Sequence, residues 1–200
     1  LVRDGRWTLD KLGEYAALGA NLNGDASFDF AADGNATYGI ATWYTGATAM
    51  LLGSGEQYIK RDDNNKPYLS IENDHFYSVC EKIAGITSVK GEFVAINDKA
   101  NNKHYELAFA DSRCLMTIAE VKASNQFRNM NDSFGVLPMP KYDENQENYV
   151  CYRAPATIYL CVPVTNTTLT ETAAVLDAAS YLSHTDVLPV YYNVTIAQKG

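Results

Sequence analysis

The chain reads Cys114-Leu115-Met116-Thr117-Ile118 where a strand is predicted to lead directly into a helix. This run is apolar, has the length of a strand, and meets no glycine or proline before the predicted helix of residues 119–130. Further strands are predicted at 134–137 and 156–162, and the second is apolar at both parities, as in a strand covered on both faces. Because strands alternate with helices, we expect an α/β protein with a mostly parallel sheet and helices on both faces.

Capping residues and apolar spacing predict more helices upstream of this run. Thr8 is the expected N-cap of a helix that ends before Gly19, and Thr42 is the expected N-cap of a helix through Leu52. A third helix is expected to stop at Gly85. Its core-facing stripe has members at helical spacing, namely Phe76, Val79, Cys80 and Ile83.

A hairpin and a last helix complete the predicted elements. Residues 58–61 and 67–71 flank five turn-forming residues, which indicates a β-hairpin with a solvated tip. Thr168 and Glu171 have the spacing of a capping box for a helix through Ser183. The predicted buried stripe of that helix consists of Leu169, Ala173, Leu176 and Ala179 or Ser180.

The composition is that of an ordinary globular protein with an acidic balance. Hydrophobic residues make up 46% of the 200 residues, and 16 basic against 24 acidic side chains give a net charge of -8. No run of Lys or Arg could neutralise a series of phosphates, so nucleic acid is excluded as a partner. No apolar run approaches the roughly 20 residues of a membrane span. Any targeting segment is expected to lie outside residues 1–200. The four cysteines form no C-x-x-C pair, and buried free thiols are favoured over a disulfide.

No catalytic or cofactor motif is recognised. His75, His104 and His184 lie far apart without ligand spacing, so no transition-metal site is predicted. A P-loop, a dinucleotide fingerprint and a G-x-S-x-G elbow are also missing from the sequence. We therefore expect no cofactor and no enzyme, although carboxylates brought together by the fold would leave a glycosidase open.

The segment from Asn21 to Asp33 alternates oxygen-bearing side chains like the start of a calcium loop. The match fails at Ala26, where the sharp turn needs glycine, and at Ala32, where a bidentate acid should close the coordination shell. A solvated turn rich in Asn and Asp is favoured, and no metal site is assigned.

Several segments, taken in order, resemble the family 1 extracellular solute-binding proteins of bacterial ABC importers, especially the sugar-type lipoproteins of Gram-positive bacteria. The clearest match is the block from Phe134 to Tyr142, and the others occur in the family's order along nearly the whole chain. The matching segments are Asp4-Gly5-Arg6-Trp7-Thr8-Leu9-Asp10, Leu22-Asn23-Gly24-Asp25, Tyr38-Gly39, Phe134-Gly135-Val136-Leu137-Pro138-Met139-Pro140-Lys141-Tyr142 and Pro189-x-Tyr191-Tyr192.

The resemblance implies a periplasmic-binding-protein-like (type II) fold, in which two α/β lobes close on a ligand and the closed form is recognised by the membrane permease. Residues 1–200 would form one lobe, the second, with hinge-proximal segments, and would lack the N-terminal lobe and the C-terminal helices. The implied function is reversible capture of a carbohydrate-type ligand for an ABC permease. The full-length protein would be extracellular and lipid-anchored, or periplasmic in a Gram-negative cell.

The residues expected to bind the ligand follow the carboxyl ends of the strands. In open α/β sheets ligands bind beyond these ends, which indicates Thr42, Trp43 and Tyr44 after the segment 38–41 and Glu120 after the run at 114–118. Just before the predicted strand at 156–162 stand two more candidates, Tyr152 and Arg153. An aromatic ring would stack on a sugar, and Glu120 and Arg153 would hydrogen-bond its hydroxyls.

Alternative interpretations stay open at this point. Trp43 and Tyr44 could pack into the core, Glu120 could only complement a helix dipole, and Arg153 could be a solvated hinge residue. The rival functions are a carbohydrate-active enzyme or lectin-like surface module, and an interaction domain without ligand binding.

Overall fold

The structure is a computed structural model that describes residues 1–31, 33–98, 103–151 and 160–196. The chain divides into two compact units. The first comprises Leu1–Asp132 and Val136–Tyr152, and the second comprises Ser133–Gly135 and Arg153–Gly200.

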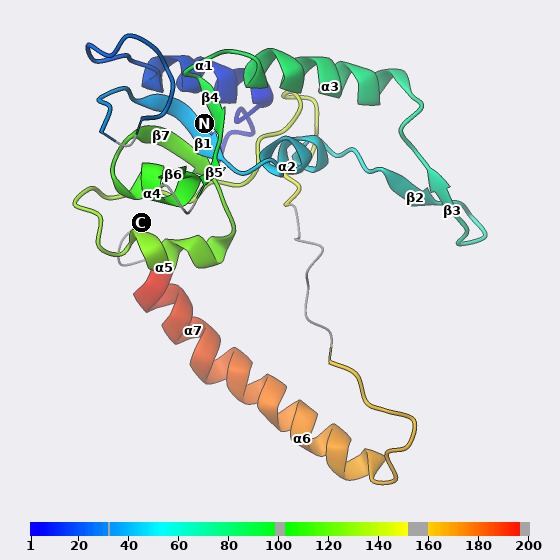
Figure 1. Cartoon of the computed structure of the whole chain (residues 1–200). Coiled ribbons are helices and arrows are strands. Elements are labelled where there is room, and N and C mark those ends of the chain that lie inside the picture. Colours follow the sequence, from blue (N-terminus) through cyan, green and yellow to red (C-terminus); the bar gives the residue numbers. More distant parts are fainter. Residues whose placement is uncertain (32, 99–102, 152–159, 197–200) are drawn as a thin grey trace. The chain divides into compact units, whose positions relative to one another are not determined.

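A three-stranded parallel sheet forms the centre of the first unit, in the order β4-β1-β7 (Figure 1). Its strands are β1 (Tyr38–Thr42), β4 (Phe93–Ala95) and β7 (Cys114–Ile118). Ile40 of β1 is opposite Phe93 on one side and Met116 on the other. All five residues of β1 are buried, as expected for a central parallel strand covered on both faces. The predicted α/β class and the strand at 114–118 are therefore confirmed.

Helices and loops cover both faces of this sheet (Figure 1). Ile40 belongs to a cluster with side chains of three helices, whereas its neighbour Ala41 packs with Phe30 and with the fourth helix of the unit. The three helices are α1 (Leu9–Gly19), α2 (Gly46–Gly53) and α3 (Asp74–Thr87), and the fourth is α4 (Tyr105–Ala110). Consecutive residues of β1 thus face two separate apolar cores.

Helix α1 follows its sequence signals closely and lies tightly against β1. The Thr8 hydroxyl accepts a hydrogen bond from the backbone N–H of Lys11 at 3.4 Å, which confirms the predicted cap. A Cβ added at Gly39 would overlap the backbone of Ala16, so glycine at this position allows the helix to approach the strand.

Short elements surround the sheet. A first hairpin joins β2 (Ile59–Arg61) to β3 (Pro67–Leu69), confirms the predicted turn, and extends away from the sheet (Figure 1). A second antiparallel pair joins β5 (Asn97–Asp98) to β6 (Lys103–His104). After β7 come η1 (Val121–Ala123) and α5 (Ser124–Phe127).

Four local predictions were wrong. Thr42 ends β1 instead of capping a helix, and α2 begins only at Gly46. Gly85 lies inside α3, which continues to Thr87, because a helical glycine costs only about 1 kcal/mol and the apolar stripe goes on to Ile86. Residues 119–130 form short helical turns instead of one helix, and residues 134–137 form no strand.

The block around Lys141 packs against the start of α1. Lys141 is 3% exposed, donates its backbone N–H to Trp7, and accepts a hydrogen bond from the N–H of Leu9 at 2.8 Å. Its ammonium group donates to the carbonyl of Gln146 at 2.8 Å. The indole N–H of Trp7 donates to the carbonyl of Pro138 at 2.9 Å. The block is therefore part of the scaffold, although the strand predicted at its beginning is not formed.

The described part of the second unit is mainly helical. Its elements are α6 (Leu169–Leu182), η2 (Ser183–Val187), α7 (Leu188–Val190) and η3 (Tyr191–Ile196), where η2 and η3 are π-helical. The predicted helix is confirmed, but Thr168 makes no side-chain cap. The predicted stripe is not buried, since no residue of α6 is buried and Leu169 is exposed.

Two further predictions concern the strand at 156–162 and the state of the cysteines. The strand predicted at 156–162 lies largely outside the described residues, and residues 160–162 are not in a strand. All four cysteines are free, as predicted, but burial holds only in part: Cys114 is buried and Cys80 half-buried, whereas Cys151 and Cys161 are exposed.

Candidate functional site

The carboxyl edge of the parallel sheet brings two of the predicted segments together. Thr42 and Ile118 are paired at the ends of β1 and β7, so the residues after them leave the sheet side by side. The Thr42 hydroxyl donates to the carbonyl of Ile118 at 2.8 Å, and Thr42 is only 1% exposed. Thr42 therefore joins the two strands at this edge, and its hydroxyl proton is already engaged.

Trp43 and Tyr44 form an exposed aromatic pair directly after β1. Their ring centroids lie 4.5 Å apart at an interplanar angle of 67°, and the residues are 39% and 68% exposed. The carbonyl of Trp43 accepts a hydrogen bond from the N–H of Gly46 at 2.9 Å, which closes the turn into α2. A Cβ at Gly46 would press on the Thr42 side chain, so this glycine permits the tight turn that presents the rings. The alternative that both rings pack into the core is not what the structure shows.

Glu120 follows β7 at the same edge. Its carboxylate lies 2.6 Å from the ammonium of Lys122, and both side chains are exposed. This hydrogen bond, with the charge of Glu120, raises the pKa of Lys122. Exposed pairs of this kind contribute little to stability, so both groups can exchange their contact for one with a ligand.

Tyr105 and Glu106 reach this edge without having been predicted. The N–H of Ile96 donates to the carbonyl of Thr42, and the N–H of Tyr105 donates in turn to the carbonyl of Ile96 at 3.2 Å. The Tyr105 hydroxyl donates to Glu106 at 3.3 Å. Burial, the charge of Glu106, the hydrogen bond to Glu106 and the charge of Glu120 together raise the pKa of Tyr105 to about 12. The backbone hydrogen bonds from Thr42 through Ile96 place the start of α4 next to the end of β1.

His104 fixes the orientation of this added pair. Its Nδ1 caps α4 by accepting from the N–H of Glu106 at 3.4 Å, and its ring lies 4.4 Å from that of Tyr105. The Glu106 carboxylate accepts a hydrogen bond from the Tyr105 hydroxyl, and its other oxygen lies 3.4 Å from His104 Nδ1. The sequence offered one signal for this site, namely the polar His104 before the short apolar run of α4. The segment before His104 has no clear periodicity, so the sequence did not indicate that α4 is connected to the sheet.

Tyr152 and Arg153, the remaining predicted ligand-binding residues, lie outside the described residues. Of the six predicted positions, the structure therefore brings four together at one edge of the sheet: Thr42, Trp43, Tyr44 and Glu120.

No family model, no curated protein and no solved structure matches the chain. Within the described residues, no helix is long and apolar enough to cross a membrane.

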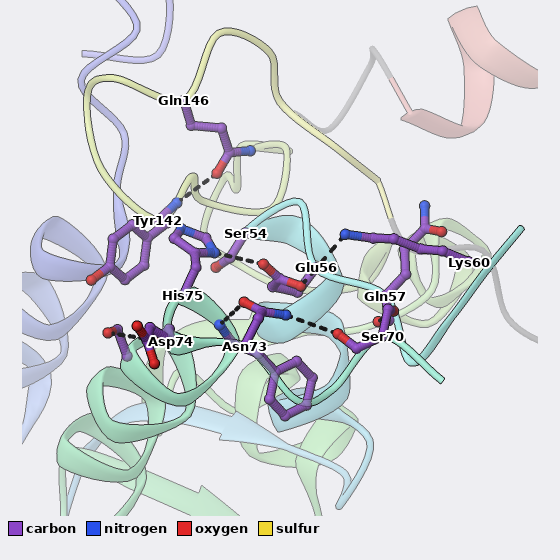
Figure 2. Close-up of polar contacts among 12 residues, drawn as sticks. Ser54, Glu56, Gln57, Lys60, Ser70, Asn73, Asp74, His75, Tyr142 and Gln146 are labelled. Atoms are coloured by element: carbon purple, nitrogen blue, oxygen red, sulfur yellow. Dashed lines mark hydrogen bonds and ion pairs between the residues drawn. The ribbon is translucent and has the colours of Figure 1, made fainter. Parts of the chain in front are cut away.

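A second polar cluster surrounds Glu56, between α2 and the first hairpin (Figure 2). Glu56 is nearly buried, and its carboxylate lies 2.6 Å from Nδ1 of His75 and 3.9 Å from the ammonium of Lys60. Its Oε2 has no hydrogen-bond partner among the described residues. The ring of Tyr142 packs on His75 with the centroids 4.8 Å apart, and Gln146 accepts from the Tyr142 N–H.

This cluster connects elements of the scaffold. Asn73 caps α3 by accepting from the N–H of Phe76 at 2.8 Å and donates to the carbonyl of Ser70 next to the hairpin (Figure 2). The Ser70 hydroxyl donates to the carbonyl of Gln57. Since Glu56 finds its charge partners within the protein, we interpret the cluster as a structural joint of α3 and the hairpin.

The acidic loop forms a hollow of about 280 Å³ lined by seven residues: Asp25, Ala26, Ser27, Asp29, Ala31, Asp33 and Gly34. The Asp25 carboxylate accepts from the N–H groups of Asn35 and Ala36, both at 2.7 Å. Asp29 likewise accepts from the N–H of Ala31. Among the described residues, no group of three or more His, Cys, Asp or Glu side chains is placed to hold a metal ion. The Asp29 bond is that of an Asx turn, whereas the Asp25 carboxylate joins backbone groups 10 and 11 residues further along the chain.

Proposed function

We propose that the chain is the ligand-binding part of a solute-binding protein of an ABC importer, and that it holds a carbohydrate-type ligand at the carboxyl edge of its sheet. The observation that carries the proposal is the exposed pair of Trp43 and Tyr44 after the end of β1, with Glu120 following the end of the neighbouring strand β7. Aromatic faces stack on the apolar faces of sugar rings, and carboxylates accept hydrogen bonds from the hydroxyl groups around them. Large aromatic side chains exposed together are also a common mark of a binding surface.

The position of these residues supports the same proposal. Parallel α/β sheets bind their ligands beyond the carboxyl ends of the strands, and the pair and Glu120 follow two neighbouring strands there. The resemblance to family 1 solute-binding proteins adds the partner and the location. The full-length protein would work at the outside of a bacterial cell, lipid-anchored or periplasmic, and would deliver the ligand to a membrane permease.

Binding without turnover is the expected chemistry. Of the two carboxylates of Glu106 and Glu120, the first is buried and accepts a hydrogen bond from Tyr105, and the second is exposed and paired with Lys122. A glycosidase needs an acid and a base that both reach the scissile bond, and the buried Glu106 does not present its carboxylate at the surface. Release of product from a panel of glycosides would instead support a carbohydrate-active enzyme, and sugar binding without a permease partner a lectin-like module.

Tryptophan fluorescence tests the proposal on the chain itself. Trp43 is exposed, whereas Trp7 is buried and hydrogen-bonded to Pro138. A sugar stacked on Trp43 should protect its emission from acrylamide quenching, and Trp7 provides the unquenched reference. We expect Trp43→Ala to lose at least tenfold of the affinity, which is about 1.4 kcal/mol; because the reporting ring is gone in this variant, its affinity is measured by nuclear magnetic resonance titration.

The matched control is Tyr68→Ala. Tyr68 is similarly exposed but lies in the hairpin, away from the carboxyl edge. It should leave the protection unchanged. A panel of neutral mono- and oligosaccharides that gives no protection of the unmodified chain would refute the proposal, and a sugar affinity that Trp43→Ala leaves unchanged would remove the aromatic pair from the site.

A further inference from the structure

The two exposed aromatic rings after β1 do not lie in one plane, and this geometry bears on the shape of the sugar that the site accepts. This step rests on the proposed function. The ring planes of Trp43 and Tyr44 are inclined by 67° and their centroids lie 4.5 Å apart, so the edge of one ring points at the face of the other. Such a contact covers one face of only one ring. Each ring therefore keeps at least one face free of its partner.

The backbone on both sides of the pair is held by hydrogen bonds. Thr42 is 1% exposed and its hydroxyl donates to the carbonyl of Ile118, whereas the carbonyl of Trp43 accepts from the N–H of Gly46 at 2.9 Å. A Cβ at Gly46 would overlap the Thr42 side chain, so the turn packs directly against the end of β1. The angle between the ring planes can then change mainly by rotation of the two side chains, which breaks the contact between the rings.

Oligosaccharides differ in the angle between neighbouring sugar rings. In glucans of the cellulose type the rings form a flat ribbon, whose faces match a platform of coplanar aromatic rings. In glucans of the starch type the chain turns at each linkage, so neighbouring rings are inclined to each other. From the inclined pair of Trp43 and Tyr44 we infer that the site selects oligosaccharides that turn from one unit to the next over oligosaccharides that form flat ribbons.

The contact between the two rings sets the expected size of this selection. An edge-to-face pair of aromatic rings contributes roughly two- to tenfold to an equilibrium constant beyond the effect of the area that it buries. A flat glucan that stacks on both rings must rotate one of them out of this contact, and a flat glucan that stacks on one ring does not use the second. A turning glucan meets both rings as they stand, so the protein is already organised for it. We expect a preference of roughly fivefold.

The experiment compares maltotriose with cellotriose on the full chain. Both are uncharged trimers of glucose that differ only in their linkage, so composition and charge cannot cause a difference in affinity. Dissociation constants are measured by nuclear magnetic resonance titration. We expect maltotriose to bind roughly fivefold more tightly than cellotriose. Equal affinities, or tighter binding of cellotriose, would overturn the inference.

Two variants of Tyr44 assign the preference to the ring pair. Tyr44→Ala removes one of the two planes and should bring the ratio of the two affinities close to one, whereas Tyr44→Phe keeps the ring and should keep the preference. Tyr68→Ala removes an exposed ring from the hairpin and should leave the ratio unchanged. Urea titration followed by the emission of the buried Trp7 checks that each variant is folded. A preference that persists in folded Tyr44→Ala would contradict the assignment to the ring pair.

The outcomes also distinguish this inference from the proposed function. If cellotriose binds at least as tightly as maltotriose, the selection by shape is wrong while sugar binding stands. If neither trimer nor any sugar of the panel that tests the proposed function binds, the proposed function fails and the selection fails with it.

Discussion

Replacing Tyr38 by Phe tests whether the apolar core around Phe30 and Ala41 depends on one buried hydrogen bond. Tyr38 begins β1 and is almost fully buried, and its hydroxyl oxygen accepts the backbone N–H of Phe30 at 2.7 Å. Phe30 has a positive φ of 54°, a conformation that a bulky residue adopts only when its surroundings hold it there. Arg113 lies over the Phe30 ring, 4.9 Å from its centroid, and donates to two carbonyls of the same loop.

The magnitude follows from what Tyr38→Phe leaves behind. The ring and its contacts remain, but the buried N–H of Phe30 loses its acceptor, and an unsatisfied buried donor costs about 1 to 3 kcal/mol. We therefore expect the free energy of unfolding to fall by about 2 kcal/mol. Urea titration followed by the emission of the buried Trp7 measures the difference.

The control for this prediction is Tyr68→Phe, which removes the same hydroxyl from an exposed ring in the hairpin. It should change the free energy of unfolding by less than about 0.5 kcal/mol. The reasoning would be refuted if the two substitutions had equal effects.

Two further predictions concern packing and pH. Gly39→Ala should lower the free energy of unfolding by at least about 2 kcal/mol, because its Cβ would overlap the Ala16 backbone, whereas Gly85→Ala should raise it by about 0.5 to 1 kcal/mol, since open space lies around a glycine inside α3. Thermal denaturation of both variants checks these opposite signs, and equal signs would contradict the packing described for α1. The folded-state pKa of Tyr105 is raised from 10.0 to about 12, so the folded state keeps its proton longer and stability must fall as pH rises from 10 to 12. Denaturant titrations across that window should show a shallower fall for Tyr105→Phe, and an identical slope would show that the phenol is not shielded.

Local signals made α1 and β1 predictable. The Thr8 cap and the apolar spacing of α1 are local signals that belong to the helix itself. In β1, the consecutive residues Ile40 and Ala41 are both apolar because both faces of the strand are covered. By contrast, β4 was missed. Its three residues carry no pattern of their own, and they become a strand only by pairing with β1. Pairing of distant residues is not visible in local periodicity.

The errors have the same physical origin. Residues 134–137 have strand-like side chains, but they do not form a strand in the structure. In α6 the helical spacing was recognised, and yet a stripe is buried only where another element covers it. The positions of Trp43 and Glu120 after strand ends were predictable because the rule for carboxyl ends of strands depends only on where strands stop. Tyr105 was not, since it reaches this edge through backbone hydrogen bonds that no spacing reveals.

The two tryptophans differ in their role: Trp7 belongs to the buried scaffold, and Trp43 belongs to the proposed binding site. Trp7 is buried beside the block around Lys141, and the N–H, carbonyl and ammonium groups of Lys141 all bind partners within the unit. Because these groups are already engaged within the unit, the block serves the scaffold and is not among the residues proposed to bind a ligand. Trp43, by contrast, is exposed after the tight turn that follows β1. A residue that binds a ligand needs an exposed side chain, so Trp43 depends on the scaffold only through the strand end and the turn that position it. The proposed ligand has therefore to be sought among Trp43, Tyr105 and Glu120 rather than at the Lys141 block.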